Sequence, residues 1–208
     1  INASSGNVVL NEGTNDFPKA IKIVGVNVTL VDTNAIDLGA STVGGDYAVT
    51  AGGDITDSGV LIIEGTSTFT ASGDQSILLT QSSTFTGAVT FASGGTLAGV
   101  SITDSTDFDL EALTLTGNLV VVSGGFITQG GALTIGGTSS FTTSTSNKTI
   151  ALPITTNAFT GAVTLNTTGT TGNAEIDGGT TKLDIAASSV RGNLTLTSGA
   201  AAGIIDSG

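Results

Sequence analysis

The sequence contains no cysteine, methionine, tryptophan or histidine, and only two prolines and one tyrosine occur among its 208 residues. Without cysteine the chain has no disulfide framework and no thiolate metal site. Without histidine it has no imidazole base and no histidine-ligated metal site. Cationic residues are scarce too, with five Lys and Arg against 17 Asp and Glu and a net charge of -12. Such a chain repels polyanions, so we expect no nucleic-acid partner and no binding to anionic membranes.

Long apolar runs and helical patterns are also missing. The longest apolar runs, such as Leu119–Val122, are far too short to cross a bilayer, so membrane insertion is not expected. No long stretch keeps the apolar periodicity of a helix. Instead, 31 Gly, 37 Thr and 21 Ser separate short runs of Val, Ile, Leu and Phe. This pattern is too apolar for a disordered linker and is typical of short strands joined by turns, which predicts an all-β fold.

The sequence repeats itself at a period of about 72 to 75 residues, and self-similarity at a fixed period is the signature of repeat architectures. The third copy carries one inserted residue. The matched segments are Val28–Leu38 with Val100–Leu110 and Ala174–Ile185, Gly65–Phe69 with Gly137–Phe141, Phe85–Phe91 with Phe159–Leu165, and Gly45–Thr50 with Gly117–Val122 and Gly192–Thr197.

A shorter spacing lies inside the long one. Starting at Gly6, a glycine precedes an alternating strand pattern at intervals of 39, 20, 22, 30, 20, 24 and 31 residues. We interpret this as three unequal coils per repeat and about eight coils in all, the 39-residue interval being a long coil with an insertion near Asn15–Ile23. Glycine suits sharp corners, where the backbone often needs a positive φ. The predicted corner glycines are Gly45, Gly65, Gly87, Gly117, Gly137, Gly161 and Gly192.

Coils of about 20 to 30 residues with about three short strands each predict a parallel β-helix, or β-solenoid. A β-sandwich also has many short strands, but its strands would not follow this periodicity. Alternation such as Leu113-Thr-Leu-Thr116 places apolar side chains inside and threonine outside. Because the phenylalanines recur in step with the repeat, we expect core ladders of Phe69, Phe85, Phe141 and Phe159.

We expect residues 1–208 to be a single solenoid segment. The repeat copies are roughly 1–44 (partial), 45–116, 117–191 and 192–208 (partial). Solenoids need polar capping coils at their ends, and neither end of this sequence has one. The segment is therefore expected to belong to a longer chain or to meet identical units end to end.

Several runs resemble the repeats of large bacterial exoproteins, the filamentous-haemagglutinin-like adhesins and related β-strand-repeat surface proteins. They are Ser41–Gly45, Val49–Gly59 and Gly87–Phe91, and the resemblance covers the chain beyond about Val24. It implies a secreted, right-handed parallel β-helix that acts in adhesion, biofilm or cell-surface layers. The expected function is thus that of a structural extracellular rod or filament on the bacterial surface. Its expected partners are further solenoid units placed end to end.

Other functions are less consistent with the residues. Lyases and hydrolases on β-helices need a base or a carboxylate pair with cationic and aromatic residues nearby, which this chain has in very small number, so no enzyme is expected. No cofactor is expected either, although calcium is left open because Asp-rich turns supply oxygen ligands. Threonine pairs spaced for ice binding occur, but unequal coils are not expected to align them. The weak calcium candidates are Asp32, Asp37, Asp54 and Asp104.

The alternative function is that of an adhesin passenger that binds a host or carbohydrate ligand. Insertions in solenoids often carry binding, and the segment Asn15–Ile23 holds Pro18 and two of the four lysines. The candidate ligand-loop residues are Asn15, Asp16, Lys19 and Lys22.

Overall fold

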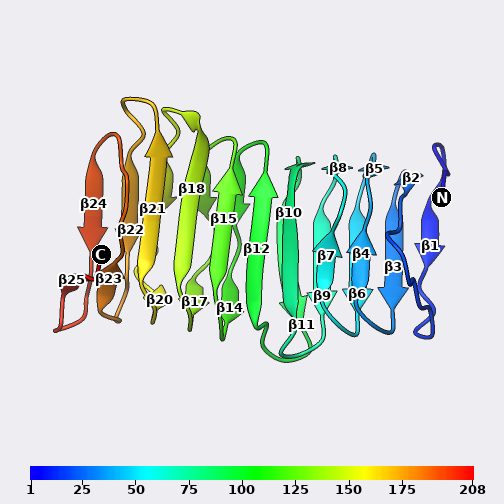
Figure 1. Ribbon diagram of the computed structural model, residues 1–208, viewed down its shortest axis with the longest axis horizontal. Helices are drawn as coiled ribbons and strands as arrows, with labels where there is room; N and C mark the ends of the chain where they lie inside the picture. Colours follow the sequence, from blue (N-terminus) through cyan, green and yellow to red (C-terminus); the bar gives the residue numbers. More distant parts are fainter. The chain divides into compact units, whose positions relative to one another are not determined.

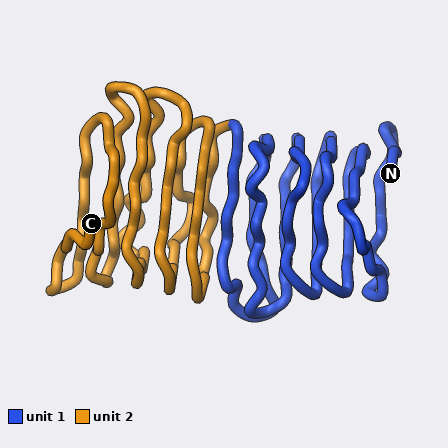
Figure 2. The backbone as a smooth tube through the Cα atoms, viewed as in Figure 1, with its two compact units in different colours: residues 1–105 blue, residues 106–208 orange.

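The computed structural model describes all of residues 1–208, which form 25 strands and no helix (Figure 1). No helix is therefore available to cross a membrane. The strands pair in parallel, and each lies beside the strand of the next turn of the chain. This is the β-solenoid that the sequence predicts. The chain divides into two compact units, residues 1–105 and residues 106–208 (Figure 2).

Unit 1 has three faces, because the strands of successive turns stack in three columns. The first face is built from β1, β3, β6, β9 and β11, the second from β4, β7, β12 and the first half of β10, and the third from β2, β5, β8 and the end of β10. The strands are β1 Val8–Leu10, β2 Val24–Gly25, β3 Val28–Asp32, β4 Ile36–Leu38, β5 Ser41–Val43, β6 Tyr47–Ala51, β7 Ile55–Asp57, β8 Leu61–Ile63, β9 Ser67–Ala71, β10 Ser76–Phe85, β11 Val89–Ser93 and β12 Gly99–Asp104.

Unit 2 has the same plan. Its three faces are β13-β16-β19-β22-β24, β14-β17-β20 and β15-β18-β21-β23-β25. The strands are β13 Phe108–Leu110, β14 Leu113–Leu115, β15 Leu119–Ser123, β16 Ile127–Gln129, β17 Leu133–Ile135, β18 Ser139–Ser146, β19 Ile150–Leu152, β20 Ala158–Phe159, β21 Val163–Thr168, β22 Ala174–Asp177, β23 Leu183–Ile185, β24 Leu194–Thr197 and β25 Ile204–Asp206.

The number of turns differs from the sequence-based estimate. One face of each unit has five strands, so the chain makes about ten turns where eight were expected. The long interval between Gly6 and Gly45 holds two ordinary turns, one from Val8 to Val28 and one from Val28 to Tyr47. The corner before Val28 was missed because it reads Val26-Asn27 and has no glycine.

The repeat and the turn have different lengths. In unit 1, Val28, Tyr47, Ser67 and Val89 stack on the first face, three turns in all. Val100, the repeat equivalent of Val28, stacks instead with Ile77 on the second face. One repeat is therefore three turns plus one face. Unit 2 behaves in the same way, because Leu119 lies on β15 whereas its equivalent Leu194 lies on β24 of another face.

This mismatch corrects the reading of the longest intervals. The interval from Gly161 to Gly192 is not a long coil, since it runs from β21 on one face of unit 2 to β24 on another face, more than one turn later. The length of a turn is the number of residues between strand positions that pair in register, and it varies by only a few residues. The turn from Val28 to Tyr47 is a shorter example, and the turn from Ile150 to Ala174 is a longer one.

The core fills the inside of each unit with every second residue of the strands. Burial alternates along β3, β6 and β9, as the parallel pleat requires. Phe69 packs edge-on against Tyr47 at 6.0 Å and against Phe85 at 6.1 Å between ring centroids. In unit 2, Phe141 packs edge-on against Phe159 at 6.3 Å. All four predicted ladder phenylalanines are buried, whereas Phe126 is exposed.

Candidate functional site

Several of the predicted corner glycines lie where successive turns approach closely. A Cβ atom on Gly87 would lie 2.6 Å from the Gly65 carbonyl carbon and 2.9 Å from the Thr66 amide nitrogen. A Cβ on Gly161 would meet the Gly137 carbonyl carbon at 2.6 Å. Gly65, Gly87, Gly137 and Gly161 thus require glycine because of the backbone of the preceding turn.

The expected reason for these glycines was wrong. Positive φ angles occur at Gly169, Gly179 and Gly203, and none of the predicted corner glycines is among them. Close stacking of turns, rather than a left-handed backbone, excludes a side chain at Gly65, Gly87, Gly137 and Gly161.

Asparagine and aspartate side chains continue this stacking on the outside of one corner of unit 1. Asn27 Oδ1 accepts the Asp46 N–H at 2.9 Å, and Asp46 Oδ1 accepts the Thr66 N–H at 2.9 Å and the Thr66 hydroxyl at 2.8 Å. The backbone N–H and then the hydroxyl of Thr66 lower the pKa of Asp46. Each side chain therefore satisfies an amide of the next turn that the sheet ladders leave unpaired.

Two of the four calcium candidates, Asp32 and Asp54, serve the backbone in a similar way. Asp32 is buried and accepts the N–H groups of Phe17 at 3.0 Å and Asn34 at 2.8 Å. Asp54 accepts the Ser76 N–H at 2.7 Å. Asp37 and Asp104 lie on other strands, and no three acidic side chains come together in a group that could hold a metal ion.

Asp57 is a buried acidic residue that the sequence analysis did not single out. Its carboxylate accepts the Thr80 N–H at 2.7 Å and the Gln81 N–H at 3.2 Å. Burial raises its pKa, the two amides oppose that rise, and the nearby charge of Asp37 adds to it. The arrangement holds a corner of unit 1 together.

The segment Asn15–Ile23 is not an insertion. It belongs to the turn from Val8 to Val28, an ordinary turn in length, and Ile21 bridges in parallel to Leu38 of the next turn. Asn15 is held by a bond from its Nδ2 to the Leu10 carbonyl, while Asp16, Lys19 and Lys22 are exposed. The expectation of an inserted loop was wrong because two turns were counted as one.

Two surface hollows nevertheless flank this segment. The larger, of about 520 Å³, is lined by Ile1 and Phe17–Lys22, and is apolar apart from its two lysines. The smaller, of about 240 Å³, lies between Asp16–Ala20 and the residues Ala35–Asp37 and Thr56. Lys19 borders both hollows.

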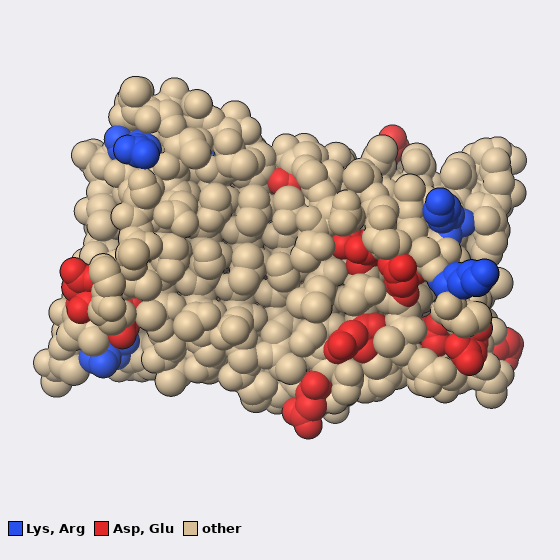
Figure 3. Space-filling view, viewed as in Figure 1, with Lys and Arg blue, Asp and Glu red and all other residues tan.

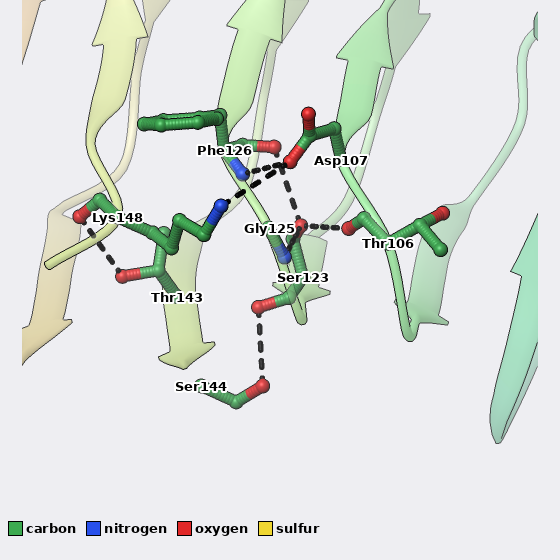
Figure 4. Close-up of polar contacts among 8 residues, drawn as sticks. All are labelled: Thr106, Asp107, Ser123, Gly125, Phe126, Thr143, Ser144 and Lys148. Atoms are coloured by element: carbon green, nitrogen blue, oxygen red, sulfur yellow. Dashed lines mark hydrogen bonds and ion pairs between the residues drawn. The ribbon is translucent and has the colours of Figure 1, made fainter. Parts of the chain in front are cut away.

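A corner of unit 2 combines an exposed aromatic ring with two charges (Figure 4). Lys148 Nζ lies 4.2 Å from the Phe126 ring centroid and 4.0 Å from Asp107 Oδ1. Asp107 Oδ1 also accepts the Phe126 N–H at 2.8 Å. An ion pair and a cation–π contact thus meet at a single lysine.

The sequence held a signal for this corner that was overlooked. Phe126 stands at the position equivalent to Asp54 in the preceding copy, after the same Gly-Gly pair. An exposed aromatic that replaces an acidic residue departs from the repeat, whereas Phe69 and Phe85 recur as Phe141 and Phe159. Asp107, Phe126 and Lys148 come from three successive turns, and their contacts hold these turns together.

The charges of the chain are unevenly distributed. On the face shown in Figure 3, acidic side chains gather in separate groups, basic ones are few, and a wide area is uncharged.

The chain was compared with known proteins. No curated protein and no solved structure matches it. A family model described as repeats of unknown function (DUF5649) matches residues 25–92 and again residues 97–166. The starts of the two matched segments are offset by the same amount as Val28 and Val100, which is the period found in the sequence itself. The link to filamentous-haemagglutinin-like adhesins stays a prediction, and the chain belongs to the DUF5649 family of repeats.

Proposed function

We propose that this chain is a non-catalytic structural segment of an extracellular bacterial surface protein, such as an adhesin, a biofilm matrix protein or a cell-surface layer protein. Stacked turns give it stiffness, and it forms part of a rod or filament. The observation that carries the proposal is the continuous ladder of parallel pairs within each unit, closed over an apolar core.

The mechanical argument follows from the bonds between turns. Successive turns within each unit are joined by backbone hydrogen bonds between parallel strands, and corner side chains such as Asn27 and Asp46 add further bonds. Bending the solenoid would open many of these bonds together and expose core residues to water. A repeat of this kind resists bending while using few residue types, which agrees with the absence of Cys, His and Trp.

The open strand edges favour assembly. β25 pairs only with β23, and β24 pairs only with β22. Leu194 and Ile204 are 45% and 44% exposed, although they stack on the fully buried Ala174 and Leu183. A further solenoid turn, from the same chain or from a second copy, would cover these side chains and pair both edges.

Electron microscopy and sedimentation of the purified chain at rising concentration test the proposal. Rods longer than one chain, or concentration-dependent association, are expected. Ile204→Lys should prevent this association, because it places a charge where the next turn would pack. Val120→Lys, on the side of unit 2 where Val120 is already exposed, should not. A chain that stays monomeric at every concentration would contradict end-to-end assembly.

The alternative is a ligand-binding role for the segment Asn15–Ile23, which the two hollows beside Phe17–Lys22 favour. A host or carbohydrate ligand would contact Lys19 and Lys22 at its polar groups and Phe17 at its apolar part. The double variant Lys19→Gln and Lys22→Gln should abolish adhesion and leave the far-UV circular dichroism spectrum unchanged. Lys182→Gln in unit 2 is the matched control, and equal adhesion of both variants would contradict this role.

A further inference from the structure

The third face of unit 1 carries an exposed apolar patch on its outer side. Its strands stack in register, so the outward residues of successive turns lie side by side. The outward row at the centre of the face is Val24, Thr42, Ile62 and Thr84. Val26 follows β2 and Val60 precedes β8, so these two side chains extend the patch at opposite ends of the strands. Val24 and Val26 are each 38% exposed, Val60 is 42% exposed and Ile62 is 44% exposed.

A further turn of the solenoid cannot cover this patch. β5 pairs with β2 on one edge and with β8 on the other, and β8 pairs in turn with β10. The backbone of these strands is therefore already paired, and the patch faces sideways from the stack of turns. An exposed cluster of large apolar side chains on the side of a protein is typical of a contact with another molecule.

Two opposite charges lie at opposite corners of the patch. Lys22 comes just before Ile23, whose carbonyl accepts the Thr42 N–H at 2.8 Å, and the Glu64 N–H donates to the Val43 carbonyl at 3.0 Å. Lys22 is thus two residues before Val24 in one turn, and Glu64 is two residues after Ile62 two turns later. Two strand spacings and four residues separate their Cα positions by about 16 Å. Both side chains are exposed, and neither makes an ion pair within the chain.

This arrangement is complementary to itself. The apolar side chains cross the patch along one diagonal, from Val26 to Val60, and the two charges lie on either side of that diagonal. If two copies meet face to face about a two-fold axis along the diagonal, apolar side chains face each other and Lys22 of each copy lies over Glu64 of the other. A two-fold contact uses the same patch on both copies, so it forms two such ion pairs.

We propose that the third face of unit 1 binds the same face of a second copy of this chain, side by side, in a two-fold dimer. Burial of Val24, Val26, Val60 and Ile62 drives the pairing, and the two ion pairs fix its orientation. A purely acidic or purely basic partner would match only one of the two charges. A second copy matches both, which is why it fits this patch best.

Side-by-side pairing goes beyond the end-to-end assembly of the proposed function and is measured separately from it. A two-fold contact closes at two copies, whereas end-to-end contacts continue to add copies. All variants of this test therefore carry Ile204→Lys, which blocks growth at the end of unit 2. Sedimentation of this chain at rising concentration should show a reversible equilibrium between monomer and dimer, and a weak one because the patch is small.

Exchange of the two charges tests the orientation. Lys22→Glu and Glu64→Lys should each weaken the dimer at least about tenfold, because each brings like charges together at both contacts. An equimolar mixture of the two variants should dimerise again, since the acidic positions 22 and 64 of one then face the basic positions 22 and 64 of the other. A misfolded variant could not give this rescue.

Replacement of an apolar residue tests the patch itself. Ile62→Lys should abolish the dimer. Leu78→Lys is the matched control, because Leu78 is 38% exposed on the second face of the same unit and should dimerise like the parent chain. Circular dichroism should show that both variants are folded.

Three results would overturn the proposal. They are a parent chain that stays monomeric at every concentration, a charge-exchanged mixture that stays monomeric, and equal dimerisation of Ile62→Lys and Leu78→Lys. A monomeric chain that instead binds neutral phospholipid vesicles, and loses this binding in Ile62→Lys, would overturn it too and assign the patch to a lipid surface.

Discussion

Replacing Gly65 by alanine should destabilise the solenoid through a clash between turns. The added Cβ would lie 2.6 Å from the Gly45 carbonyl oxygen and 2.6 Å from Asp46 Oδ1, and closer still to the Gly45 carbonyl carbon. Favourable contacts between carbon atoms lie at about 3.5 to 4.0 Å, so the two turns must separate locally by roughly 1 Å. Separation strains the bond from the Gly65 N–H to the Gly45 carbonyl, now 3.0 Å long.

The expected loss of stability follows from two opposing effects. Overpacking of this kind costs about 1–3 kcal/mol. Alanine lowers the entropy of the unfolded chain, which returns about 0.4–1 kcal/mol where its backbone angles are allowed. Since Gly65 has no positive φ, that gain applies, and the net loss is about 1–2 kcal/mol. For a chain of this size the melting temperature should fall by about 2–8 °C.

Thermal melts followed by far-UV circular dichroism measure this loss. Gly44→Ala is the matched control, because its Cβ would meet nothing within 4 Å and its φ is not positive. Gly44→Ala should leave the melting temperature unchanged or slightly raised. If Gly65→Ala is as stable as Gly44→Ala, close stacking is not the reason for glycine at this corner.

Three further predictions concern buried polar groups. Tyr47 is fully buried and its hydroxyl has no hydrogen-bond partner, so Tyr47→Phe should stabilise the fold by about 1 kcal/mol in urea titrations. Burial also raises the pKa of Tyr47. The wild-type tyrosine should therefore ionise only as the chain unfolds, as followed by its ultraviolet absorbance. Burial raises the pKa of Asp57, so its ionised carboxylate destabilises the fold at neutral pH, and this effect disappears on acidification. Asp57→Asn should therefore have a higher melting temperature than the wild type at pH 7, and the difference should shrink towards pH 4. A difference that does not change with pH would refute this assignment. Asn157 is buried and bonds Gln129, the Leu133 N–H and the Asp177 carbonyl, so Asn157→Ala should cost about 3 kcal/mol, whereas the exposed Asn118→Ala should cost less than about 1 kcal/mol, both measured by urea unfolding.

Much of the fold could be predicted because local chemistry and the global fold agree. Alternating Val, Leu and Thr gave the strands, and the recurrence of Phe69 at Phe141 pointed to the core. The turn count failed because Val26-Asn27 forms a corner without the glycine that marks the others. Asn27 holds this corner through its side chain, which accepts the Asp46 N–H of the next turn.

The surface was harder to predict than the core. The register between turns depends on where extra residues are placed. The corner after Ala71 holds the extra residues of its turn, so the strands of the first face of unit 1 stay in register. The contact of Lys148 with Phe126 joins two successive turns. The two side chains meet only because the number of residues between them completes one turn. The sequence repeat also does not reveal that equivalent strands of successive copies lie on different faces, because the sequence does not state how many residues complete a turn.

The central claim is that successive turns of each unit stack in register, and distances between spin labels test it most directly. Val9 and Thr90 lie at the two ends of one outward row, four turns apart, and the chain has no cysteine of its own to compete for the label. In the variant with Val9→Cys and Thr90→Cys, electron–electron double resonance should give a narrow distribution centred at about 19 Å between the labelled positions, four strand spacings. A broad distribution, or a distance well beyond this value, would contradict the stacked solenoid.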